Sequence, residues 1–326
     1  EILDCTKFPI FESAVVRNAI NLFQKNSKGS KKVGYRNTAN VTSFFELLER
    51  TRESMEADSL LAMNQNWGLA FNLGSKELNV VNVISGFSDE VVNHYDVSQG
   101  YIPYRKSDLV QLYGKDKGEQ IVKERLWHSP SPLDESYIQE IYGRDITKYA
   151  YQASGGYVKY GKHVACYVDL RFFNSHRLLV REITNPQIIA CLLDELYVND
   201  PQLISVIQRD KEFSLELLWG ILNSKLATYY HFHHSPKATK GAFPKILVQD
   251  IKGFPLPNIS PEQKNDIYSL TSQILANKKQ NADTTALENK IDFLVYHLYG
   301  LTYDEVLIVD PATPITREEY EAYKGE

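Results

Sequence analysis

The chain has 326 residues, with 36 Lys and Arg against 41 Asp and Glu and a formal net charge of −5. This length allows two or three folded units, and the apolar runs are too short to cross a bilayer, which argues against a membrane protein. The negative charge argues against nucleic-acid binding over the whole surface. Three cysteines, Cys5, Cys166 and Cys191, lack the spacing of a metal site and suit a reducing compartment, so we expect a cytoplasmic protein.

The charge is unevenly distributed along the chain. Residues 141–185 hold seven Lys and Arg against three Asp and Glu, and residues 201–256 hold seven against four. Residues 260–326 hold six against twelve. A basic middle followed by an acidic tail fits a polyanion site confined to one part of the surface. Chance segregation of charge is the alternative.

In chain order, the hydrophobic pattern of residues 1–55 predicts only some of the helices and strands. Residues 11–24 fit a helix or a strand, and the polar residues 26–40 predict a loop or linker. Thr42 or Ser43 is expected to cap a helix that runs to about Met55.

The middle of the chain favours strands. Residues 76–94 fit a helix or a strand. Residues 95–185 are predicted to be mostly strands and loops, with short strands at Tyr157–Tyr160, Val164–Val168 and Leu178–Ile183.

The last third favours helices. Ser214 is expected to cap one long helix that runs to about His231. A helix should begin at Pro261, and a second should span Thr284–Tyr299 and stop at Gly300, which together predict an antiparallel hairpin. The expected fold is therefore α+β, with a mixed, largely antiparallel sheet followed by a C-terminal helical hairpin.

Aromatic, glycine and basic residues recur together in predicted loops, a composition suited to presenting cations and flat rings to DNA. One such loop offers the candidate DNA contacts Tyr101, Tyr104, Arg105 and Lys106, unless it is a turn packed on the core. In a second turn, Arg144 can read guanine, hold a phosphate, or form a structural network with the neighbouring aspartate.

Arg177 and Arg181 lie four residues apart on a predicted strand, so they share one face. That face can be a phosphate-binding strip, or its arginines can form structural ion pairs. Further along, Lys237, Lys240 and Lys245 are expected to contact phosphates from a loop after the long helix.

Three histidines, His231, His233 and His234, precede that loop. A zinc site is disfavoured because no Cys or acidic residue lies nearby with ligand spacing. A hydrolase built around these histidines is one rival interpretation.

The order of several short motifs resembles the TaqI-like C-terminal specificity domain, which follows an adenine-specific DNA methyltransferase in type IIG restriction-modification enzymes and related phage-defence proteins. The motifs are Trp67, Gly100-Tyr-Ile-Pro-Tyr104, Gly143-Arg-Asp-Ile146, Tyr160-Gly161, Arg177-Leu-Leu-Val-Arg-Glu-Ile183, Leu222-Asn-Ser-Lys225 and Phe254-Pro-Leu-Pro257. The segments Phe8–Ala14 and Ala19–Phe23 resemble the last strands of the methyltransferase domain, and Ile291–Gly300 resembles a closing helix.

The resemblance implies three parts: residues 1–40 as the end of a methyltransferase domain and a linker, 41–258 as a DNA target-recognition domain, and 259–326 as the helical hairpin and tail. It implies a fragment that binds double-stranded DNA, orients an adenine for an attached methyltransferase, and has no catalytic, cofactor-binding or metal residues of its own.

The family's Asn-Pro-Pro-Tyr type of motif and its glycine-rich S-adenosylmethionine loop are absent from the sequence, since Asn185-Pro186 continues into Gln187. We therefore expect S-adenosylmethionine and the methylation chemistry, with or without an endonuclease, in sequence upstream of Glu1. The alternative function is a protein-interaction scaffold that uses the acidic helical tail.

Overall fold

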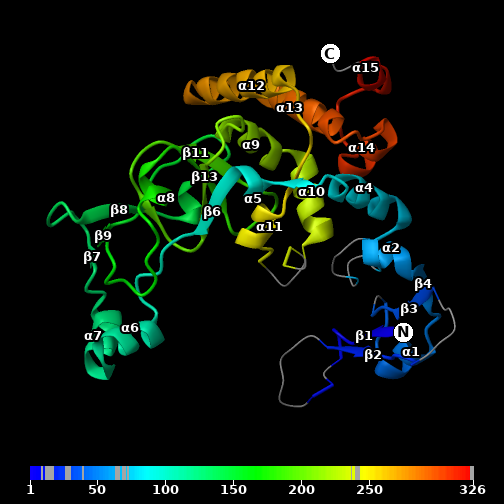
Figure 1. Ribbon diagram of the computed structural model, residues 1–326, viewed down its shortest axis with the longest axis horizontal. Helices are drawn as coiled ribbons and strands as arrows, with labels where there is room; N and C mark the ends of the chain where they lie inside the picture. Colours follow the sequence, from blue (N-terminus) through cyan, green and yellow to red (C-terminus); the bar gives the residue numbers. More distant parts are fainter. Residues whose placement is uncertain are drawn as a thin grey trace. The chain divides into compact units, whose positions relative to one another are not determined.

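The computed structural model describes residues 1–8, 10–11, 18–25, 31–38, 40–62, 67, 71, 73–235, 237–238 and 243–323. The chain forms two compact units, Glu1–Ser85 and Gly86–Glu326 (Figure 1). This division differs from the predicted boundaries at 40/41 and 258/259, which concern function and stay predictions. Among the helices of the described ranges, none is long and apolar enough to pass through a membrane.

The first unit is a small sheet with three helices. Its strand order is β2-β1-β3-β4, with β1 parallel to β3. The strands are β1 (Ile2–Asp4), β2 (Ala19–Asn21), β3 (Lys32–Arg36) and β4 (Glu53–Glu56), and the helices are α1 (Phe44–Glu49), α2 (Ala57–Ala62) and α4 (Ser75–Ser85). The two open alternatives are thus decided: a strand lies within 11–24, and a helix begins the 76–94 segment. The loop predicted for residues 26–40 is wrong over Lys32–Arg36, because these residues pair with β1 and β4 as strand β3.

Ser43 caps α1 as predicted, because its Oγ accepts a hydrogen bond from the Glu46 backbone N–H at 3.2 Å. The helix ends at Glu49 rather than near Met55, because the backbone becomes extended at Arg50 (ψ 140°) and continues into β4.

The second unit is built on a four-stranded antiparallel sheet. Its order is β11-β10-β13-β6, from β6 (Tyr95–Gln99), β10 (Arg177–Arg181), β11 (Ala190–Leu193) and β13 (Leu203–Gln208). Consecutive residues of β10 and β13 are buried, so both faces of these strands are covered. Helix α9 (Leu215–Leu222) lies against β10 and β11, and α8 (Arg171–Asn174) lies against β13 (Figure 1).

A second sheet in this unit has the order β12-β8-β9-β7. Its strands are β7 (His128–Ser129), β8 (Tyr137–Ile141), β9 (Tyr157–Lys159) and β12 (Val198–Asn199). Strand β9 confirms the predicted strand near Tyr157. The predicted strand at Val164–Val168 is wrong, because only Cys166 forms an isolated bridge, to Ile102.

Between β6 and β7 the chain forms two helices, α6 (Lys106–Tyr113) and α7 (Lys115–Glu124). The prediction of strands and loops for residues 95–185 missed both. Few apolar residues mark them, because α6 buries only Leu109 and α7 only Gly118 and Ile121. A Cβ on Gly118 would lie 2.7 Å from the Val110 backbone nitrogen, so the glycine permits the close crossing of the two helices.

The single helix predicted from Ser214 to His231 is two helices, α9 and α10 (Lys225–His234). Asn223 ends α9, and its side chain pairs with both backbone groups of Ala190 at 2.9 Å. Ser224 then caps α10, since its Oγ accepts from the Ala227 N–H at 3.1 Å. The break therefore docks the helices against β11.

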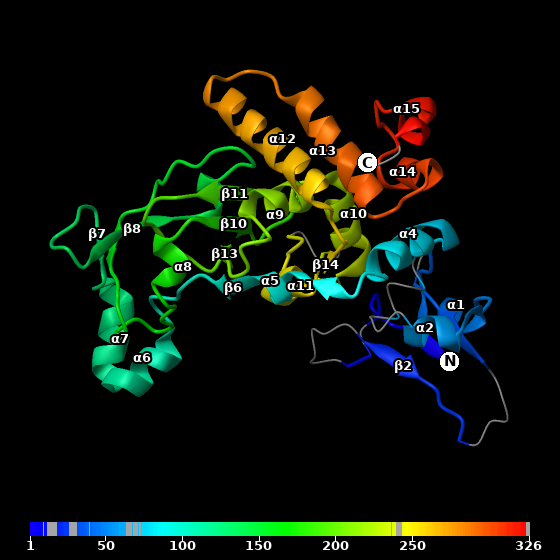
Figure 2. The ribbon, with the colours of Figure 1, turned by 45° about the horizontal axis from the view of Figure 1, so that its top comes forward.

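The C-terminal hairpin is confirmed. Helix α12 (Pro261–Lys279) begins after Ser260 with a capping box to Gln263, and α13 (Thr285–Leu298) ends before Gly300 at φ 67°. The hairpin packs on α9, where a Cβ on Gly220 would lie 2.8 Å from Ile267 (Figure 2).

Short elements complete the second unit. They are β5 (Asp89–Glu90), α5 (Val91–His94), the 3-10 turn η1 (Gly143–Asp145), α11 (Val248–Lys252), β14 (Pro255–Leu256), α14 (Tyr303–Val309) and α15 (Arg317–Ala322). The observed architecture confirms the predicted α+β fold class with largely antiparallel sheets.

Candidate nucleic-acid interface

A buried carboxylate organises the surface around the second sheet. Glu140, on β8, is 2% exposed and accepts hydrogen bonds at 2.7 Å from His128 Nε2 and the Tyr142 hydroxyl. The Tyr101 hydroxyl also donates to it. A further hydrogen bond of 2.8 Å joins His128 Nδ1 to the Tyr104 hydroxyl. These five residues, the Glu140 network, tie together three segments that are distant in sequence: residues 101–104, His128 and residues 140–142.

The Glu140 network is charged at its centre and neutral at its edges. Burial alone raises the pKa of Glu140, but the hydrogen bonds from His128, Tyr101 and Tyr142 outweigh burial, so the pKa lies below its usual value. Burial raises the pKa of Tyr104 to about 12, and burial together with the Glu140 charge raises that of Tyr142 further. The tyrosines therefore keep their protons at neutral pH and hold the carboxylate in place.

Two arginines lie over the tyrosine rings of this network. The Arg125 guanidinium is 5.0 Å from the centre of the Tyr104 ring, and the Arg144 guanidinium is 4.8 Å from that of Tyr142. Arg125 is exposed, and the Arg144 side chain is 72% exposed. We call these two residues the arginine pair. They present cations at one place on the second unit.

The turn that carries Arg144 is fixed by its neighbour. The buried Asp145 carboxylate accepts from the backbone N–H groups of Tyr142 at 2.9 Å and Ser154 at 3.1 Å. Arg144 Nε lies 3.8 Å from this carboxylate and donates to Ser154 Oγ at 3.3 Å. The structural network expected as an alternative thus exists, yet it leaves the guanidinium open to solvent.

Two predicted DNA contacts are wrong because their side chains are fully buried. Tyr101 is 0% exposed, and its ring packs edge-on against Tyr160 and Phe173. Arg177 is also 0% exposed, and its guanidinium donates to three backbone carbonyls. Neither side chain can touch a duplex while the unit is folded.

The predicted phosphate strip on β10 does not form. Arg177 is buried, and Arg181 is half-buried with its guanidinium bound to its own chain, at 3.1 Å to the Ile183 carbonyl and 3.2 Å to that of Asn185. The even spacing placed both side chains on one face, but other elements cover that face.

Two of the three predicted phosphate-binding lysines lie beside each other. The Lys245 backbone N–H donates to the Lys237 carbonyl at 3.2 Å. Lys237 is exposed, whereas Lys245 is half-buried with its amine 3.0 Å from Glu182. Lys240 lies outside the described residues. Their contact with phosphate stays a prediction.

Arg105 and Lys106 lie at the start of α6 and are exposed. Each already faces a carboxylate, Asp108 at 3.0 Å for Arg105 and Glu119 at 3.2 Å for Lys106. Such exposed pairs contribute little and exchange readily with other anions. Both residues stay candidate contacts.

The histidines that suggested a rival hydrolase do not form an open site. His231 is 3% exposed and bonds Thr184 Oγ1 at 3.1 Å, and His233 Nδ1 lies 2.7 Å from the Tyr229 carbonyl. Across the described ranges, no group of three or more His, Cys, Asp or Glu side chains is arranged to hold a metal ion.

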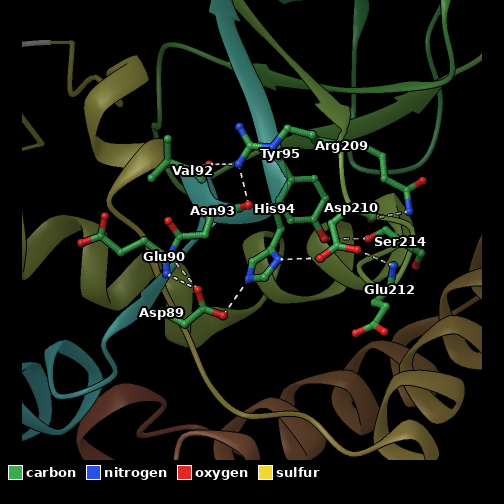
Figure 3. Close-up of polar contacts among 11 residues, drawn as sticks. Asp89, Glu90, Val92, Asn93, His94, Tyr95, Arg209, Asp210, Glu212 and Ser214 are labelled. Atoms are coloured by element: carbon green, nitrogen blue, oxygen red, sulfur yellow. Dashed lines mark hydrogen bonds and ion pairs between the residues drawn. The ribbon is translucent and has the colours of Figure 1, made fainter.

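A different histidine, missed by the sequence patterns, lies between two carboxylates (Figure 3). His94 Nε2 is 2.7 Å from Asp89, and Nδ1 is 3.2 Å from Asp210. Its ring stacks on Phe213 at 3.6 Å, and Arg209 Nη2 donates to the Val92 carbonyl at 2.6 Å. The cluster links β5 and α5, at the start of the second unit, to the residues that follow β13. Its role is therefore structural.

We expect His94→Ala to lower the free energy of unfolding by about 1–2 kcal/mol, because two partly exposed carboxylates lose a charge-assisted partner. Urea unfolding followed by fluorescence measures this loss. DNA affinity of the folded variant should equal that of the wild type. If the variant has the same free energy of unfolding as the wild type, the cluster does not stabilise the fold.

With this geometry in view, the comparisons with known proteins identify the class. Residues 138–256 match the family model of the TaqI-like C-terminal specificity domain. The predicted resemblance is confirmed over these residues: this part of the chain is similar to the TaqI-like C-terminal specificity domain.

One relative is a Methanocaldococcus jannaschii protein named as a candidate type II restriction enzyme and methyltransferase. It is 32% identical over 152 residues, which are 44% of this chain and 13% of the relative. The chain thus corresponds to only a small part of that protein.

Two solved structures share weak likeness. The type IIG restriction endonuclease BpuSI has a TM-score of 0.37 at 11% identity, covering 87% of this chain and 41% of the endonuclease. The type IIL enzyme MmeI in complex with DNA has a TM-score of 0.42 at 11% identity, and the match covers 72% of this chain and 37% of MmeI. At these scores neither likeness bears on what this chain does.

Proposed function

We propose that this chain recognises a short sequence in double-stranded DNA for an adenine-specific DNA methyltransferase in the same polypeptide. The observation that carries the proposal is the TaqI-like specificity domain at residues 138–256. The exposed arginine pair over Tyr104 and Tyr142 supports it, because exposed cations beside aromatic rings suit a duplex with its phosphates and base edges.

The first unit fits attachment to another domain. Its described part has four large apolar side chains that are more than half exposed: Phe11 at 58%, Leu22 at 55%, Phe23 at 91% and Phe45 at 78%. A methyltransferase domain that packs there would use S-adenosylmethionine and supply the chemistry. Cytoplasmic location stays part of this proposal.

The salt dependence of duplex binding tests the proposal. A recognition module that neutralises several phosphates should lose affinity steeply with salt, with a log–log slope of about −0.9 per phosphate contacted. Lys237→Ala is expected to weaken all duplexes alike and to reduce that slope by about 1. Fluorescence anisotropy of a labelled duplex at several salt concentrations measures both quantities.

Lys279→Ala is the matched control, because Lys279 is an exposed lysine at the end of α12, within the acidic C-terminal hairpin. Its slope and affinity should equal those of the wild type. If the wild-type chain binds duplex no better than an acidic protein of similar size, the proposal fails and the protein-interaction scaffold becomes the better interpretation.

A further inference from the structure

We propose that Arg125 and Arg144 read guanine edges in the target sequence, and that the Glu140 network positions them. The inference rests on the proposed function and adds which side chains specify the site and which base they select. Arginine that donates to guanine O6 and N7 through two N–H groups is the commonest specific contact between protein and duplex.

The setting of the arginine pair suits bases better than phosphates. A bidentate contact with a base edge needs a planar donor held in one orientation, whereas a phosphate tolerates a mobile point charge. Each guanidinium rests on a tyrosine ring, and both tyrosine hydroxyls are fixed to the Glu140 network at 2.7–2.8 Å. Rings held by a buried network orient the cations above them.

Arg125 occupies a backbone position at which glycine is the ordinary residue. It follows α7 as the C-cap, at φ 49° and ψ 50° in the left-handed region. An arginine is not needed to end the helix. Its guanidinium instead reaches Tyr104, a residue 21 positions earlier that is bound to the centre of the network through His128.

Two exposed lysines, Lys106 and Lys237, provide the contrast. Lys237 and Lys106 rest on no ring among the cation–ring contacts of the described residues, and Lys106 faces Glu119 at 3.2 Å. These lysines suit contacts that hold DNA without selecting its sequence. We therefore assign sequence specificity to the arginine pair and binding affinity to these two lysines.

The test is selection of duplexes from a randomised pool by the 326-residue chain and three variants. Arg125→Gly removes the guanidinium while keeping the left-handed cap, so it should fold at least as well as the wild type. Arg144→Lys keeps the charge and removes the planar fork. Tyr142→Phe keeps the ring under Arg144 and removes its hydrogen bond to Glu140.

We expect the wild type to enrich one sequence that contains guanines. Arg125→Gly and Arg144→Lys should each lose roughly 5- to 100-fold of the preference at a guanine position, and those positions should differ between the two variants. Tyr142→Phe should lose preference at the Arg144 position only, with unchanged binding to unselected duplexes. A purely structural role of Tyr142 would instead lower all binding together.

Two negative outcomes have different meanings. A wild-type chain that enriches no sequence would overturn the proposed function itself. In the second outcome, the wild type enriches one sequence, and both arginine variants enrich that sequence with the same base preferences. This result would leave the proposed function standing and overturn the present inference. Lys237→Ala serves as the control that should weaken binding without changing the enriched sequence.

Discussion

Replacing Arg177 by alanine is expected to lower the free energy of unfolding by about 3–5 kcal/mol. The fully buried guanidinium donates to the carbonyls of Ser175 at 3.1 Å, Glu195 at 2.9 Å and Tyr197 at 3.0 Å. Burial lowers the pKa of Arg177 to about 10, so the side chain is still charged at neutral pH. Alanine would remove a fully buried side chain and leave three partly buried carbonyls without their donor.

Urea unfolding of both proteins measures the loss, and Arg171→Ala is the matched control. Arg171 is half-exposed on α8 and pairs with Asp96 at 2.7 Å, so its removal should cost less than about 1 kcal/mol. DNA affinity per folded molecule should be unchanged by Arg177→Ala. A small loss of stability together with a large loss of affinity would restore Arg177 as a DNA contact.

Local signals explain which elements could be predicted. Ser260, Pro261 and Gln263 form a helix start within four residues, and Gly300 ends the hairpin by adopting positive φ. The start and the end of a helix depend on residues that are close in sequence, so the sequence pattern predicts them. The α+β class follows from the same kind of signal.

The errors involve contacts between distant residues. An arginine on a strand has the same spacing whether it faces phosphate or three carbonyls. Two of the three carbonyls that hold Arg177 come from Glu195 and Tyr197, which lie 18 and 20 residues further along the chain. Arg125 was missed because its ring partner comes from another segment. His94 was missed because one of its two carboxylates, Asp210, is 116 residues away.

The stability of the second unit is expected to depend on pH through buried histidines in α10. Burial lowers the pKa of His231 and of His234 to about 4, from an ordinary value of 6.5. The unfolded chain therefore takes up protons first as pH falls, so stability decreases between about pH 6.5 and 4 and is unaffected above that range. The difference corresponds to about 3 kcal/mol per histidine.

A buried carboxyl acts in the opposite direction. Burial raises the pKa of Asp292 from 3.8 to about 6, although its contacts with Lys225 pull the pKa down. The folded state therefore binds this proton more tightly than the unfolded state, and its contribution to stability increases as pH falls through 6. Asp200, with its pKa also raised to about 6 by burial, adds to this effect. The histidines and these two carboxyls therefore contribute to the wild-type profile with opposite signs.

Single substitutions separate the two groups. Relative to wild type, His231→Gln should lose less stability between about pH 7.5 and about pH 4.5, because one proton acceptor of the unfolded state is removed. Asp292→Asn should lose more, because it removes a gain of about 2 kcal/mol over this pH range. Its side-chain oxygen can still accept from the Lys225 backbone N–H, which lies 2.9 Å from the carboxylate in the wild type. Urea unfolding at both pH values measures these differences, with His233→Gln as the control on the same helix. Profiles of both variants that run parallel to that of the wild type would contradict the assignment, since burial would then not separate the proton affinities of the folded and unfolded states.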